Sequence, residues 1–136
     1  MDKNLIEKMV EAAIDVVSKY GDDQNHTVGA AVVTKDGKII TGINVYHFTG
    51  GPCGEIVAMG NAISNGEKDL VGIVAIGNWN RGVLSPCGRC RQVLFDYYPD
   101  MQVILGKDEG YVVKGVRDLL PDVYDWREQQ ADDIAE

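Results

Sequence analysis

Three cysteines and one glutamate could form a metal site in this 136-residue chain. Cys53 and Glu55 belong to a Cys-Gly-Glu string, and Cys87 and Cys90 belong to Pro-Cys-Gly-Arg-Cys, with no other cysteine in the sequence. Three thiolates can bind one Zn²⁺ ion and leave its fourth position open for water, which distinguishes a catalytic site from a structural one. A carboxylate two residues from a ligand is placed to move protons. The residues therefore indicate zinc bound by the three cysteines, with Glu55 as the catalytic proton carrier.

Both cysteine segments are expected where a loop enters a helix. The positive end of a helix dipole lowers the pKa of a cysteine there and favours the thiolate. Cys87 and Cys90 are three residues apart, which places both sulfurs on one helical face within reach of a single ion. Three thiolates and one Zn²⁺ carry a net charge of about −1. A nearby cation would offset this charge, and Arg89 or Arg91 is the local candidate.

The elements that must position these residues follow from the spacing of apolar side chains. A helical repeat of apolar residues runs from Leu5 to Tyr20 and stops at Gly21. Strands are expected at 28–33, 39–44, 71–76, 102–105 and 111–114, and further helices at 52–64, 87–98 and 116–120. The segments 46–52 and 78–86 are rich in Gly, Asn and Pro and are expected to be loops.

This order predicts an α/β fold in a single domain over residues 1–136, with a three-layer α-β-α arrangement and a mixed five-stranded sheet. We expect the acidic end, residues 127–136, to be a frayed tail.

Composition limits the class of protein. The 45 % hydrophobic content is typical of a folded globule, and no apolar run reaches the roughly 20 residues that span a bilayer. The start of the chain does not resemble a signal peptide, and an odd number of cysteines is unlike a secreted disulfide framework. We therefore expect a cytoplasmic protein. A net charge of −8 disfavours nucleic acid and membrane surfaces as partners, and it suits a cationic small molecule.

Three simpler readings of the cysteines remain open. Each cysteine alone could be a small buried hydrophobic residue. A structural zinc site would need His26 or His47 as a fourth ligand, and neither stands at zinc-finger spacing. Disulfide exchange through Cys87-x-x-Cys90 would leave Cys53 and Glu55 without a role.

With these residues in view, the chain resembles the zinc-dependent cytidine deaminase superfamily, whose signature is a ligand-x-Glu followed by Pro-Cys-x-x-Cys. Within that superfamily it is similar to the blasticidin-S deaminases over most of residues 28–126. The most specific matching stretches are residues 44–53, 73–78, 80–86 and 119–121, together with Tyr124-x-Trp126.

Two positions depart from ordinary cytidine deaminases. Those enzymes carry a glutamate that grips the ribose hydroxyl where this chain has Tyr46, and their loop to the first cysteine is longer by two residues. The missing ribose clamp disfavours plain cytidine as the preferred substrate. They also carry an arginine after the catalytic glutamate that helps to neutralise the thiolates. Ile56 stands there in this chain, so that role would pass to Arg89.

The resemblance implies a hydrolase that converts the cytosine ring of blasticidin S, or of a similar cytosine nucleoside, to uracil with release of ammonia. Such an activity would confer antibiotic resistance. Carried over by position, the substrate contacts would come from Thr27, Asn44, Arg81, Tyr124 and Trp126, with Arg81 on the carboxylate of the antibiotic's sugar ring. Tyr46, Phe48 and Trp126 could wall the pyrimidine.

The resemblance also implies a small-molecule substrate and a homotetramer. Three alternatives remain: a cytidine deaminase of pyrimidine salvage, a polynucleotide deaminase, and a zinc-stabilised nucleoside-binding module without turnover. Short loops and strong acidity argue against the second of these.

Overall fold

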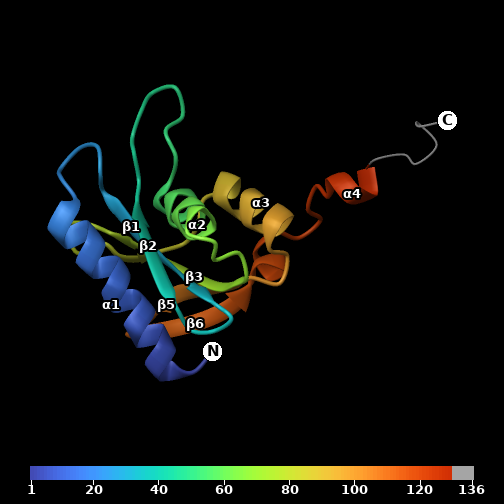
Figure 1. Cartoon of the computed structure of the whole chain (residues 1–136), viewed down its shortest axis with the longest axis horizontal. Helices are drawn as coiled ribbons and strands as arrows, with labels where there is room; N and C mark the ends of the chain where they lie inside the picture. The colour runs from blue at the N-terminus through green and yellow to red at the C-terminus, as the bar shows by residue number, and fades with distance from the viewer. Residues whose placement is uncertain (130–136) are drawn as a thin grey trace.

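Six strands form one mixed sheet in the computed structural model, which describes residues 1–129 (Figure 1). The strand order is β2-β1-β3-β5-β6, and β4 pairs with β3 off this path. The strands are β1 (Val28–Thr34), β2 (Ile39–Ile43), β3 (Leu70–Gly77), β4 (Gly82–Leu84), β5 (Gln102–Lys107) and β6 (Gly110–Gly115). The helices are α1 (Lys3–Tyr20), α2 (Gly54–Ser64), α3 (Gly88–Tyr97), the 3-10 turn η1 (Val116–Leu119) and α4 (Trp126–Gln129). Strands β3 and β5 are parallel, and the other paired strands are antiparallel.

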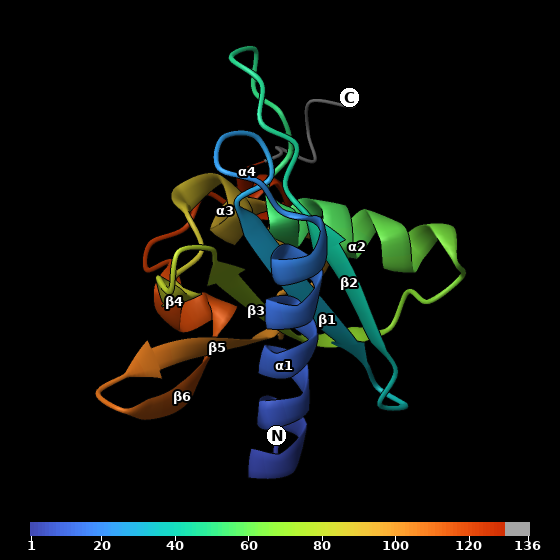
Figure 2. The same cartoon turned by 90° about the vertical axis from the view of Figure 1, so that its left-hand side faces the viewer.

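The sheet is covered on both faces, and the predicted α/β three-layer fold is confirmed. Helix α1 lies on one face and α2 and α3 lie on the other (Figure 2). The side chains of β1 alternate between the two layers because successive strand residues point to opposite faces. Ala30 and Val32 pack against α2 and α3, whereas Ala31 and Val33 pack against α1.

Helix α1 forms where the apolar repeat predicts it. The Asp2 side chain caps its start by accepting a hydrogen bond from the Leu5 amide at 2.8 Å, and the chain leaves the helix at Gly21. Its buried face consists of Met9, Val10, Ala13 and Val17. Two members of the predicted apolar face are exposed: Ile14 by 44 % and Tyr20 by 71 %. The reason is that, among residues 1–129, α1 is the one helix on its side of the sheet, so no second helix covers them (Figure 2).

The sheet has six strands where the sequence predicts five. Residues 78–86 were expected to form a loop throughout, but Val83 and Leu84 pair with Ile76 and Ala75. A four-residue connection makes this hairpin possible, because Trp79 and Asn80 both have positive φ angles, 56° and 57°. Positive φ at two successive turn residues matches the right-handed twist of paired strands. The pairing with β3 therefore overrides a local composition that is typical of a loop.

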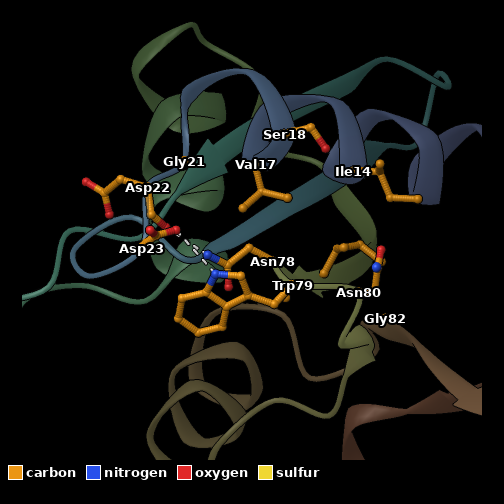
Figure 3. Close-up of a pocket in the computed structure, with 12 residues that line it drawn as sticks. Ile14, Val17, Ser18, Gly21, Asp22, Asp23, Asn78, Trp79, Asn80 and Gly82 are labelled. Atoms are coloured by element: carbon orange, nitrogen blue, oxygen red, sulfur yellow. Dashed lines mark hydrogen bonds between the residues drawn. The ribbon is translucent and has the colours of Figure 1, made fainter.

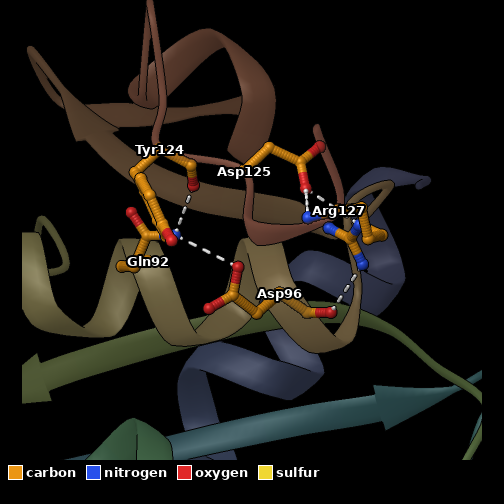
Figure 4. Close-up of polar contacts among 5 residues, drawn as sticks. All are labelled: Gln92, Asp96, Tyr124, Asp125 and Arg127. Atoms are coloured by element: carbon orange, nitrogen blue, oxygen red, sulfur yellow. Dashed lines mark hydrogen bonds and ion pairs between the residues drawn. The ribbon is translucent and has the colours of Figure 1, made fainter. Parts of the chain in front are cut away.

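The C-terminal part also differs from the prediction. The helix expected at 116–120 is a 3-10 turn that ends at Leu119, two residues before Pro121. Residues 127–129, expected to belong to a frayed tail, are part of α4, and residues 130–136 of that predicted tail lie outside the described part of the chain. Helix α4 is held because Arg127 donates to Asp125 and to the Asp96 carbonyl on α3 (Figure 4).

None of the helices in residues 1–129 is long and apolar enough to cross a membrane.

Candidate functional site

The two cysteine segments meet at the N-termini of α2 and α3. Cys53 is the N-cap residue of α2, Cys87 is the N-cap residue of α3, and Cys90 lies in the first turn of α3. Each helix therefore begins one residue after its cysteine. The sequence predicts earlier starts, at residue 52 for the first of these helices and at residue 87 for the second. Neither N-cap cysteine forms a side-chain cap hydrogen bond, and at α3 the backbone N–H groups of Arg89 and Cys90 donate to the Cys87 sulfur.

The three sulfurs are close enough to share one metal ion. All three lie within 4.8 Å of one another. Two sulfurs that bind one zinc ion tetrahedrally at about 2.3 Å are about 3.8 Å apart, a separation that falls within this limit. In the described part of the chain, no histidine or carboxylate joins this group. Three thiolates with an open fourth position fit a catalytic zinc ion.

The two histidines that could have supplied a fourth ligand are used elsewhere. The Nδ1 atom of His26 is 2.8 Å from the Asn44 carbonyl, and the Nδ1 atom of His47 lies against the Thr49 hydroxyl. Neither histidine is therefore placed as a fourth ligand of a structural zinc site. The three thiols also form one group, and only Cys90 is buried. Three unrelated hydrophobic core residues would not be expected to cluster in this way.

The surroundings of the sulfurs favour a bound cation. Burial, followed by the charge of Glu55, raises the pKa of the Cys90 thiol far above its usual range, and burial also raises the pKa of Cys53. Burial acts in the same direction at Cys87, but hydrogen bonds from the Cys90 and Arg89 backbone N–H groups and from the other two sulfurs lower its pKa overall. Three thiolates can coexist here only with a positive charge between them, which a divalent metal supplies.

Glu55 is the one charged residue among residues 1–129 that is buried, with 6 % of its surface exposed. It lies in the first turn of α2 and faces a cavity of about 260 Å³ that is also lined by Cys53 and Cys87. Burial raises the pKa of its carboxyl group, and a hydrogen bond from its own backbone N–H lowers it by less. A buried carboxyl with a raised pKa beside a cavity is suited to accept and donate a proton.

The rest of the cavity wall is mainly apolar, with three polar side chains. Asn44 lies at the end of β2, and its Oδ1 atom accepts hydrogen bonds from the Thr27 and Val28 amides at 2.6 and 2.9 Å. The other wall residues are Val28, Tyr46, Gly51, Pro52, Gly54, Leu84 and Ser85. An apolar slot with a few fixed polar groups is typical of a site for a flat heterocyclic ligand.

The structure brings only some of the predicted substrate contacts together. Asn44 and Tyr46 line the cavity with Glu55 and the cysteines. Thr27 lies one residue beyond the wall, and its amide is bound by Asn44. Phe48 is 85 % exposed in the loop of residues 44–53, which extends away from the sheet (Figure 1).

The predicted contacts from the C-terminal segment lie apart from this cavity within one chain. Tyr124 and Trp126 are not among the residues that line it, and they are 63 % and 44 % exposed. The Tyr124 carbonyl accepts a hydrogen bond from Gln92 on α3 (Figure 4). Their contact with substrate stays a prediction.

Arg81 is not among the residues that line this cavity, and it holds two loops together. Its Nη2 group donates to the Thr27 carbonyl at 2.9 Å and to Asn78 Oδ1 at 3.0 Å, and its Nε group donates to the Asn78 carbonyl. The guanidinium also lies over the Trp79 ring, 5.4 Å from the ring centroid. Within residues 1–129, Nη1 is the guanidinium nitrogen left without a hydrogen-bond partner, and it could meet an anionic group of a ligand.

Of the two candidate cations, neither directs its side chain at a sulfur through a hydrogen bond in the described structure. Arg89 is exposed, and it reaches Cys87 through its backbone N–H. The guanidinium of Arg91 donates to three oxygen atoms of Ser85, Pro86 and Leu119.

A larger hollow of about 540 Å³ lies on the α1 side of the sheet and contains none of the cysteines (Figure 3). Figure 3 shows Trp79 against Asp23 and Asn78 below α1, and the Trp79 indole donates to Asp23 at 3.3 Å. It holds no buried charged group, so it lacks the chemical features of the cysteine cavity.

Six wall residues are not among those predicted from the sequence for the site: Val28, Gly51, Pro52, Gly54, Leu84 and Ser85. Leu84 is the last residue of β4 and Ser85 follows it, in a segment whose composition predicts a loop throughout. Their position directly before Pro86-Cys87 was the available signal, because residues that adjoin a ligand often line the same site.

Comparison with known proteins agrees with this geometry. Residues 3–107 match the family model described as the cytidine and deoxycytidylate deaminase zinc-binding region. A blasticidin-S deaminase of Bacillus cereus is 35 % identical over 123 residues, covering 84 % of this chain and 88 % of that protein. A cytidine deaminase of Halalkalibacterium halodurans is 36 % identical over 129 residues, covering 91 % and 95 %. The crystal structure of cytidine deaminase from Burkholderia pseudomallei has a TM-score of 0.74 at 34 % identity and covers 91 % of this chain and 100 % of that one. The cysteine cluster, the buried glutamate and the fold thus agree with the sequence match, and the chain belongs to the cytidine and deoxycytidylate deaminase family.

Proposed function

We propose that this zinc-dependent deaminase of the cytidine type acts on blasticidin S or a closely similar cytosine nucleoside. The observation that carries the deaminase chemistry is that Glu55, Cys53 and Cys87 line one cavity, with Cys90 closing the sulfur cluster behind it. The chain is proposed to work as a single hydrolase domain in the cytoplasm, and the homotetramer stays a prediction.

The residues of the chain divide the work as follows. A zinc ion, when bound, lowers the pKa of water and supplies a nucleophile near neutral pH. Glu55 takes the proton that the water loses as its oxygen bonds to C4 of the cytosine ring, and delivers that proton to N3. Glu55 then transfers the second proton of the water to the exocyclic amino group. The C4–N bond breaks, ammonia leaves, and a uracil ring remains.

Tyr46 supports the choice of substrate. In ordinary cytidine deaminases this position belongs to the glutamate that binds the ribose, and here Tyr46 is part of the cavity wall. A phenol offers one hydroxyl group where the glutamate would offer two acceptor oxygens. The net charge of −8 suits the cationic guanidine of blasticidin S. The Nη1 group of Arg81, which has no hydrogen-bond partner within residues 1–129, is proposed to bind its sugar carboxylate.

The proposal is tested by following ultraviolet absorbance of blasticidin S and of cytidine with purified, zinc-loaded protein. We expect a higher kcat/KM for blasticidin S. The Arg81→Gln variant should lose about tenfold or more of kcat/KM for the antibiotic, equivalent to about 1.4 kcal/mol, and much less for cytidine. Arg117→Gln is the matched control, because Arg117 is a surface arginine paired with Asp100 on another part of the chain.

A plain cytidine deaminase is the second candidate, because the cytidine deaminase of Halalkalibacterium halodurans is as similar to this chain as the blasticidin-S deaminase is. A kcat/KM for cytidine that exceeds the value for blasticidin S would favour it. Absence of turnover for both compounds by protein with one zinc per chain would favour a binding module.

A further inference from the structure

Arg91 contacts the peptide groups on both sides of the Cys87 α-carbon. Its Nε group donates to the Pro86 carbonyl at 2.7 Å, which orients the peptide group that precedes Cys87. Its backbone N–H donates to the Cys87 carbonyl at 2.9 Å, which orients the peptide group that follows. The two carbonyl groups that set the direction of the Cys87 side chain are thus both held by one residue.

Cys87 needs such a hold more than the other two cysteines. Cys90 is buried within α3 and Cys53 is half-buried, whereas Cys87 is exposed and lies at the end of the loop that leads from β4 to α3. The Arg91 Nη2 group also donates to the Ser85 hydroxyl at 2.8 Å, so the Arg91 side chain binds Ser85 and Pro86 while its backbone N–H binds Cys87.

The third guanidinium nitrogen reaches a different segment. Nη1 donates to the Leu119 carbonyl at 2.8 Å, at the end of η1, where the last carbonyls of a helical turn lack partners of their own. The neighbouring Gln92 donates to the Tyr124 carbonyl at 2.8 Å (Figure 4). Two consecutive residues of α3 therefore bind the C-terminal segment. One of them, Arg91, also binds the loop of residues 85–87 that carries Cys87, which we call the ligand loop.

We propose that Arg91 is a positioning residue that holds Cys87 in place for the metal and connects metal retention to the packing of residues 116–129. All three guanidinium nitrogens donate to oxygen atoms, so Arg91 acts through the backbone of the ligand loop and not by a hydrogen bond to a thiolate. This inference rests on the zinc site and is independent of which cytosine compound is the substrate.

Zinc affinity, measured by competition with a chromogenic chelator, tests the first part without any activity assay. We expect Arg91→Gln and Arg91→Lys each to lose about 10- to 100-fold in zinc affinity, the usual effect of removing a group that orients a metal ligand. Lysine keeps the charge but cannot reach three acceptors at once, so it should not rescue binding. Lys19→Gln is the control, because it removes a charge from a surface ion pair with Asp15 on α1, and it should bind zinc like the wild type.

If Arg91→Lys binds zinc as tightly as the wild type, the proposal is overturned, because charge alone would then suffice. An equal loss in Lys19→Gln would also overturn it. Should the Arg91 variants be insoluble, Ser85→Ala removes one of the three contacts at an exposed hydroxyl and should weaken zinc binding by about two- to tenfold. Wild-type affinity in that variant would contradict the proposed role.

Hydrogen exchange tests the connection to the C-terminal segment. Removing zinc from the wild-type protein should raise amide exchange in residues 116–121 as well as in residues 85–90. In Arg91→Gln the two segments should respond separately, with 116–121 already exchanging fast before chelation. A change confined to residues 85–90 in the wild-type protein would refute the connection.

Discussion

Replacing Glu55 with glutamine should abolish deamination and leave the metal site intact. Glu55 is the one acidic residue that lines the cavity, so no other side chain there can carry the protons. The loss should therefore equal the full contribution of general acid–base catalysis, about 10²- to 10⁴-fold in kcat, or about 2.7–5.5 kcal/mol. Glutamine has nearly the same shape and is neutral, and Glu55 is only 6 % exposed, so the fold should tolerate the change without an unpaired buried charge.

The assay combines three measurements on the same preparation: zinc per chain, melting temperature and kcat with saturating substrate. We expect one zinc per chain and a melting temperature no lower than that of the wild type. Glu67→Gln is the matched control, because Glu67 pairs with Lys38 at the surface and should leave kcat unchanged. A Glu55→Gln variant that retains kcat within tenfold would refute the assigned role. If the variant loses both zinc and activity, Glu55 is needed to retain the metal, and the loss of activity no longer argues for its role in proton transfer.

Three further changes probe the metal, the helix that carries Glu55 and the loop beside Thr27. Cys90→Ala should bind no zinc at stoichiometric concentration and should melt at a lower temperature, because metal binding also stabilises the fold; a metal-free, active and stable variant would contradict this. Gly42→Ala would place a Cβ atom 2.3 Å from the Ala58 amide nitrogen, so denaturant unfolding should show a loss of about 1–3 kcal/mol. Asp22 accepts backbone hydrogen bonds from His26, Gln24 and Asn25, and these hold the pKa of its carboxyl below the usual 3.8. The ionised Asp22 carboxylate therefore stabilises the fold above the unfolded-state pKa, and this stabilisation is lost as the pH falls through the folded-state pKa. The melting-temperature difference between wild type and Asp22→Asn should accordingly shrink below about pH 4. A difference that stays constant with pH would refute the linkage.

The metal centre could be predicted from sequence because its determinants are local. The spacing of Cys87 and Cys90 within one helical turn is visible in the string itself, and Pro52 marks the loop that ends at Cys53. The meeting of the two segments depends on tertiary structure, since α2 and α3 must begin at the same end of the sheet on the same face. That part of the prediction came from the resemblance and not from spacing.

The parts that sequence reasoning missed depend on contacts between distant segments. Strand β4 has three residues and includes a glycine, so its pairing with β3 is decided by the hairpin geometry at Trp79 and Asn80 and not by propensity. Helix α4 has four residues, too few to be stable by itself. It is fastened by hydrogen bonds from Gln92 and Arg127 whose partners lie more than 30 residues away or on another helix. The local sequence does not predict such contacts.

The negative charge of the three thiolates is balanced by groups that only the tertiary structure reveals. Three thiolates and Zn²⁺ sum to about −1, and Ile56 packs against the core at the position where the family resemblance predicts an arginine for this purpose. The described structure offers a different source of positive potential, because Cys53 and Cys87 both lie at helix N-termini and the Cys87 sulfur receives backbone N–H groups from Arg89 and Cys90. Each helix N-terminus is equivalent to roughly +0.5 of a charge, so the two together approach the missing unit. Peptide dipoles cannot move away as a flexible side chain can, and a site balanced in this way keeps its charge when Arg89 points to solvent. Arg89→Ala should therefore change zinc affinity far less than a change at Arg91, which acts on the geometry of the ligand loop.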